Sequence, residues 1–170
     1  MASGLYLEVL TLLHTAISLL AIASGVIFFG ALTTHRWPVR VNVLFLVCTI
    51  LTSATGFLFP PKPIGPPFVF GVLSLLLLAV AVYALSIRHC LGRWRIGYLG
   101  TALVAQWLNM IVLIVQSYQK IPALHALAPT GSEPIVLWTQ AALAAAVCYI
   151  GWSVLRSPRA PSSIGLPTIP

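Results

Sequence analysis

The sequence predicts an all-α fold, an integral membrane bundle of five transmembrane helices with the N-terminus outside and the C-terminus cytoplasmic. Of the 170 residues, 59% are apolar and 6% are charged, too few charged side chains to cover a water-facing surface. Five apolar runs are long enough to cross a hydrocarbon core of about 30 Å as helices. The basic residues gather on one side of these runs, as the positive-inside rule describes.

Each run ends where the chain becomes too polar or too rich in proline to lie in lipid. The first run has no basic residue before Arg36 and is longer than the apolar part of a secretory signal, so we expect a retained span. The predicted spans are 7–32, 41–59, 68–87, 96–118 and 134–155. Residues 1–159 are therefore expected to form one transmembrane domain, and residues 160–170, rich in Pro and Ser, a disordered cytoplasmic tail.

The basic residues predict the orientation of the bundle. With the N-terminus outside, seven arginines fall on the inner side and only two lysines on the outer side. Both glutamates, Glu8 and Glu133, also fall outside. The inner residues are Arg36, Arg40, Arg88, Arg93, Arg95, Arg156 and Arg159, and the outer lysines are Lys62 and Lys120.

Polar side chains within the spans are the best indication of a site, because such groups are costly in lipid. Counting 1.5 Å per residue from the outer end of each span places one polar residue of every helix about 10 Å deep. Gln106 thickens this layer on the fourth span. We expect an outward-facing polar pocket, although the same side chains could simply join the helices by hydrogen bonds. The five residues of the layer are His14, Ser53, Ser74, Asn109 and Gln140.

The loop before the fifth span lies on the same outer side. Its apolar residues Ile121, Leu124 and Leu127 are spaced by three, which predicts a short helix at the interface. His125 would then lie near the mouth of the pocket. The loop is either a lid over the pocket or a plain amphipathic connection with a solvated histidine.

Three segments resemble a family of short bacterial multi-pass inner-membrane proteins of uncharacterised activity. They are TSATGFLFP (52–60), the turn Gly92-Arg93-Trp94-Arg95, and QKIPALHALAPTGSEP (119–134). The resemblance covers most of the chain and implies a bacterial inner (plasma) membrane. It carries over no activity, cofactor or site residue.

The composition argues against several kinds of chemistry. The chain has no Asp and two Glu, which leaves little for a magnesium or calcium site or for hydrolysis by paired carboxylates. A zinc or copper site on the outer side would have only His14, His125 and Glu133, because the three cysteines fall on the inner half. No nucleic-acid partner is expected for a surface that faces lipid.

The leading hypothesis is a non-enzymatic binding or accessory protein whose pocket holds a small amphipathic ligand. Amide and imidazole groups suit a neutral polar head, so a quinone-like or lipid-like ligand is expected. One alternative is a membrane redox protein that binds quinone or b-type haem, the haem held by His14 and His125. Another is a structural subunit that self-associates or docks in a larger membrane complex, where the polar residues only join helices.

Overall fold

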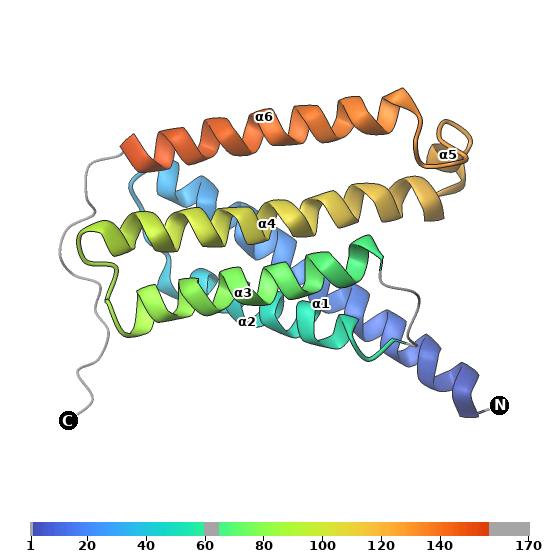
Figure 1. The fold of residues 1–170 in the computed structure, drawn as a ribbon, viewed down its shortest axis with the longest axis horizontal. Helices are drawn as coiled ribbons and strands as arrows, with labels where there is room; N and C mark the ends of the chain where they lie inside the picture. The colour runs from blue at the N-terminus through green and yellow to red at the C-terminus, as the bar shows by residue number, and fades with distance from the viewer. Residues whose placement is uncertain (1, 60–64, 157–170) are drawn as a thin grey trace.

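The structure is a computed structural model that describes residues 2–59 and 65–156. Its described part is helical, with five long helices and one short helix, and all five long helices are long and apolar enough to cross a membrane. The prediction of an all-α bundle is thereby confirmed, with five helices long and apolar enough to span a membrane, while the side on which each terminus lies stays a prediction. The helices are α1 Ala2–Thr33, α2 Val39–Gly56, α3 Pro66–Ser86, α4 Arg93–Lys120, α5 Pro122–His125 and α6 Pro134–Arg156 (Figure 1).

The helix boundaries differ from the predicted spans by a few residues. Helix α1 has 32 residues and is about 48 Å long, so its N-terminal part extends beyond the other helices (Figure 1). Helix α2 ends at Gly56, three residues before the predicted end of the second span. The predicted tail, residues 160–170, and Lys62 lie outside the described residues.

The α1–α2 turn, the α3–α4 turn and the end of α6 lie at the same end of the bundle, which we call the arginine end (Figure 1). Both turns close with residues in the left-handed region, His35 at φ 60° and Cys90 at φ 52°. The N–H of Arg36 donates to the carbonyl of Ala31, and the N–H of Cys90 donates to that of Ala84. These bonds satisfy the last carbonyl groups of α1 and α3.

Helices α1 to α4 form the centre of the molecule. Helix α1 packs on α2, α2 on α3, α3 on α4, and α4 returns to α1. Helix α6 packs against α4 and α1, and α5 contacts α4 but no other helix of the described part. We call the end that carries α5 the α5 end (Figure 1).

The apolar core lies towards the arginine end. Phe28, Phe45 and Tyr98 are fully buried there, and Trp37 packs against Phe28 and Tyr98. A smaller cluster of Tyr118, Ala128 and Val136 lies at the α5 end.

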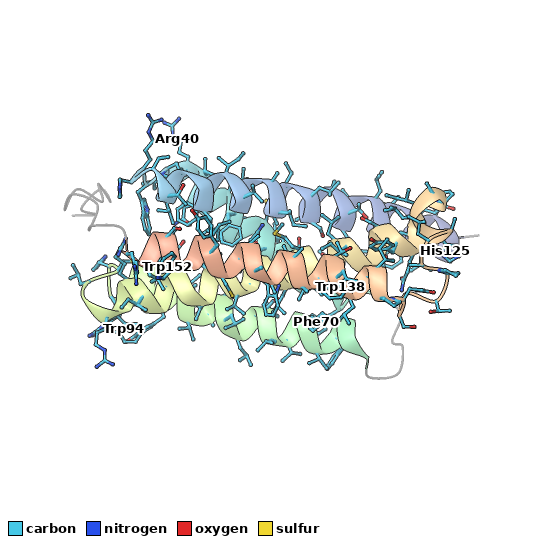
Figure 2. All side chains as sticks on the ribbon, turned by 90° about the horizontal axis from the view of Figure 1, so that it is seen from above. Arg40, Phe70, Trp94, His125, Trp138 and Trp152 are labelled. Atoms are coloured by element: carbon cyan, nitrogen blue, oxygen red, sulfur yellow. The ribbon has the colours of Figure 1, made fainter. Side chains whose placement is uncertain are left out.

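Large apolar side chains also cover the outside of the helices (Figure 2). On α6, for example, Leu137 is 70% exposed and Trp138 is 73% exposed. Such a surface is suited to lipid, and in water it would promote aggregation.

Candidate functional site

A buried pair joins α2 to α4 in the interior of the bundle. The hydroxyl of Tyr98 donates a hydrogen bond to Oδ1 of Asn42, and both side chains are fully buried. The two helices run in the same direction, since each begins at the arginine end. Residues at equal distances along α2 and α4 from this pair therefore lie at corresponding levels of the bundle.

Ser53 and Asn109 lie at the next corresponding level towards the α5 end. Each comes eleven residues after its partner in the pair, Ser53 after Asn42 and Asn109 after Tyr98. Eleven residues make about three helical turns, which returns a side chain to the same face of its helix. Ser53 is buried, and the Nδ2 atom of Asn109 is buried with no hydrogen-bond partner.

Ser74 brings α3 into the same region. It is 3% exposed and belongs to a buried stripe that continues through Leu78, Ala81 and Ala84. This spacing of three and four residues keeps all four side chains on one face of α3. Ser53, Ser74 and Asn109 therefore all face the interior of the α1–α4 bundle.

His14 links α1 to α2 nearer the α5 end. Its Nδ1 atom lies 2.9 Å from Oγ1 of Thr55, and its ring packs edge-on against Phe59. The Thr55 hydroxyl also lies 2.8 Å from the carbonyl of Leu51, and when it donates there the histidine donates from Nδ1. This tautomer leaves Nε2 as a hydrogen-bond acceptor.

Gln106 links α4 to α1. Its Nε2 donates to the carbonyl of Ile22 at 3.0 Å, while its Oε1 is buried and has no partner. The amide lies against the backbone of Gly25, where an added Cβ would come within 2.3 Å of Oε1. Glycine at position 25 is what allows this amide to reach the backbone of α1.

Gln140 and His125 lie apart from the other predicted site residues. Gln140 is at the α4–α6 contact, where its Nε2 donates to the carbonyl of Ile111 at 3.4 Å. His125 is exposed on α5, which packs on α4 and has no contact with α1. Ser53, Ser74 and Gln106 are buried, and His14 and Asn109 are half-buried, on helices α1–α4. Gln140 lies at the α4–α6 contact, and His125 is exposed at the α5 end (Figure 2).

Several side chains in the spans keep a buried polar atom without a hydrogen-bond partner. Three of them, Gln106, Asn109 and Gln140, are predicted site residues. Thr52, Trp107 and the Asn42–Tyr98 pair are not among the site residues predicted from the sequence. The eleven-residue spacing along two parallel helices is the signal that connects this pair to Ser53 and Asn109. The unpartnered atoms are Oγ1 of Thr52, Oε1 of Gln106, Nε1 of Trp107, Nδ2 of Asn109 and Oε1 of Gln140.

The predicted site residues line neither of two hollows in the described part of the molecule. The larger hollow has a volume of about 480 Å³, is open to the outside and is lined by residues 7–15 of α1, including Glu8. The smaller holds about 20 Å³ beside Gly151. Within residues 2–59 and 65–156, no three His, Cys, Asp or Glu side chains are grouped so that they could hold a metal ion.

Comparisons with protein-family models, curated proteins and solved structures find no match to this chain. What the site does must therefore be argued from its geometry.

Proposed function

We propose that the protein is a non-enzymatic binding or accessory protein of a bacterial inner membrane, with its N-terminus outside and its C-terminus cytoplasmic. The α1–α4 interior towards the α5 end binds the polar head of a small amphipathic ligand. The five apolar helices support the membrane assignment, and the polar side chains between them support the ligand.

The observation that carries the proposal is the unpartnered amide of Asn109. Its Nδ2 is buried within a membrane-spanning helix, where water cannot serve as a partner and an unsatisfied donor is costly. Ser53 lies at the corresponding level on α2. A carbonyl or hydroxyl oxygen placed between α2 and α4 would accept the missing hydrogen bond.

The chemistry of the side chains indicates a neutral head group. Within the spans, amide, hydroxyl and indole groups supply the unpartnered atoms, and none of these groups is charged. Neutral donors and acceptors match the carbonyl and hydroxyl oxygens of a quinone-like or lipid-like molecule. Because α2 and α4 face each other across the bundle and make only a small contact, we place the head group between them.

A b-type haem fits this arrangement less well. The Nε2 atom of His14 could act as a ligand in the tautomer that carries its proton on Nδ1. His125, however, lies on α5 away from α1, and His35 and His89 are in turns at the arginine end. The described residues thus provide no facing pair of histidines of the kind that usually holds a membrane haem.

The structural-subunit hypothesis has a specific observation in its favour. Three polar pairs, Tyr98 with Asn42, Gln106 with Ile22 and His14 with Thr55, already join helices by hydrogen bonds. Such bonds stabilise membrane proteins by about 0.6 kcal/mol each. Under this hypothesis, replacing Asn109 changes stability or assembly and displaces no small molecule.

Mass spectrometry of the protein extracted gently in native lipid tests the proposal. We expect a stoichiometric small molecule on the wild type and its loss from Asn109→Leu. Thr101→Val is the matched control, since the Thr101 hydroxyl donates only to carbonyls of its own helix, and it should keep the ligand. A wild-type protein that carries no small molecule, or a ligand that survives in Asn109→Leu, contradicts the proposal.

A further inference from the structure

The arginine end carries a concentrated positive charge that no acidic side chain of the protein balances. The only two acids of the chain are Glu8 and Glu133, on the first part of α1 and directly before α6, away from this end. A cluster of guanidinium groups at the level of lipid head groups therefore needs anions from its surroundings. The described arginines of this end are Arg36, Arg40, Arg88, Arg93, Arg95 and Arg156.

The α3–α4 turn carries three of these arginines, one of which stacks on a tryptophan. The guanidinium carbon of Arg88 lies 5.1 Å from the centre of the Trp94 ring. The ring of Tyr83 packs edge-on against the same indole at 5.2 Å, while Arg93 and Arg95 flank Trp94 in the sequence. A cation stacked on an indole is held in place yet keeps its N–H groups free to bind an anion.

The same turn also presents apolar side chains. Ile87 is 62% exposed and Leu91 is 70% exposed, one on each side of Arg88 along the turn. A free phosphate ion would leave these two side chains without a partner. A phospholipid supplies both a phosphate for the arginines and acyl chains for the apolar residues.

The α1–α2 turn has the charge without this arrangement. Its arginines Arg36 and Arg40 are exposed, and its tryptophan, Trp37, packs inwards on Phe28 and Tyr98. Figure 2 shows Arg40 and Trp94 at the same end of the molecule but on opposite edges. The two turns therefore differ in geometry while sharing the sign of their charge.

We propose that the α3–α4 turn is a binding site for an anionic phospholipid. Arg88, Arg93 and Arg95 bind the phosphate groups, and Ile87 and Leu91 contact the acyl chains. The site is separate from the polar interior, so its test is independent of the ligand proposed above.

Native mass spectrometry of the full chain in a neutral detergent, titrated with phosphatidylglycerol, tests this site. The variant Arg88→Gln/Arg93→Gln should weaken phosphatidylglycerol binding about 25-fold, since each arginine near an anionic surface contributes about five-fold to binding. The control Arg36→Gln/Arg40→Gln removes the same charge and should change the affinity less than about three-fold, because salt screens exposed charges at a distance. The variant Arg88→Lys/Arg93→Lys keeps the charge and should retain most of the binding even if the glutamine variant folds poorly.

Three outcomes would overturn the proposal. Equal losses in the two glutamine variants would mean that binding reflects the net charge of the whole end. Equal binding of phosphatidylcholine would show that the negative charge is not recognised. Displacement of phosphatidylglycerol by inorganic phosphate at the same concentration would indicate a site for a free anion.

Discussion

At Gly25, a single hydrogen in place of a side chain decides how closely α1 and α4 can approach. A Cβ at this position would lie 2.3 Å from Oε1 and 2.6 Å from Cδ of Gln106, and 2.9 Å from Cδ2 of Phe45. We expect Gly25→Ala to lower the free energy of unfolding by about 1–3 kcal/mol, the usual effect of overpacking. This change in the free energy of unfolding can be measured by unfolding the purified protein in mixed micelles and monitoring its circular dichroism.

Gly30→Ala is the matched control on the same helix. An added Cβ at Gly30 meets nothing within 4 Å, so this variant should be as stable as the wild type or slightly more stable. Equal destabilisation by the two variants would show that the contact between Gly25 and Gln106 is not what limits the packing.

Tyr98→Phe should destabilise the bundle by about 0.5–2 kcal/mol, because it leaves Oδ1 of Asn42 buried without its donor. The double variant Tyr98→Phe/Asn42→Leu removes both polar groups, so its effect should be smaller than the sum of the two single effects. Additive effects in the same unfolding experiment would contradict a direct interaction. Tyr83→Phe serves as a control, since the Tyr83 side chain is 43% exposed.

At the scale of single residues, the sequence could indicate which residues are polar within the spans but not what their side chains contact. His14 and Gln106 could be selected because large polar groups are rare in lipid. Their partners, the Thr55 hydroxyl and the Ile22 carbonyl, depend on the rotation of each helix about its axis. Asn42 was missed because it lies near the end of its span, where solvation would explain an asparagine.

At the scale of elements, the turn before α6 is organised by one carboxylate. The backbone N–H and the hydroxyl of Thr130 both donate to Oε1 of Glu133 at 2.8 Å. The bond from the backbone N–H contributes most to lowering the pKa of Glu133. The ionised carboxylate therefore stabilises the turn above the ordinary pKa of glutamate. That contribution is lost as the pH falls through the lowered pKa.

The Thr130 amide proton provides a direct measurement of this turn. Its NMR chemical shift should titrate with a midpoint below that of an unperturbed glutamate, and Glu133→Gln should abolish the titration. A midpoint at or above the ordinary value for glutamate would contradict the assigned hydrogen bonds.

The long helices themselves could be predicted from apolar runs, because length and composition alone decide what can cross a membrane. The positions and conformations of the helix ends were harder to predict. The two turns at the arginine end use His35 and Cys90 in the left-handed region, which residues other than glycine rarely adopt. Histidine is enriched in this region but adopts it in only a small fraction of cases, and cysteine gives no signal of it in a sequence.

At the scale of the whole molecule, charge and apolar surface divide the protein into regions. Arginines cluster at one end, apolar side chains cover the sides, and the polar interior lies between the aromatic core and the α5 end. The clustering of the arginines at one end could be predicted from the sequence, because the end at which a residue lies follows from counting residues along each span. The sequence could not predict that Gln140 lies at the contact between α6 and α4, since that depends on which helices are neighbours.

The central claim is that the chain crosses the membrane five times with the arginine end in the cytoplasm. The most direct test labels single cysteines in spheroplasts with a membrane-impermeant maleimide, after Cys48, Cys90 and Cys148 are replaced by alanine. Three spans separate positions 34 and 125, so we predict that His125→Cys is labelled from outside and Thr34→Cys only after the membrane is permeabilised. Labelling of both positions from the same side, or the reverse pattern, would contradict the account.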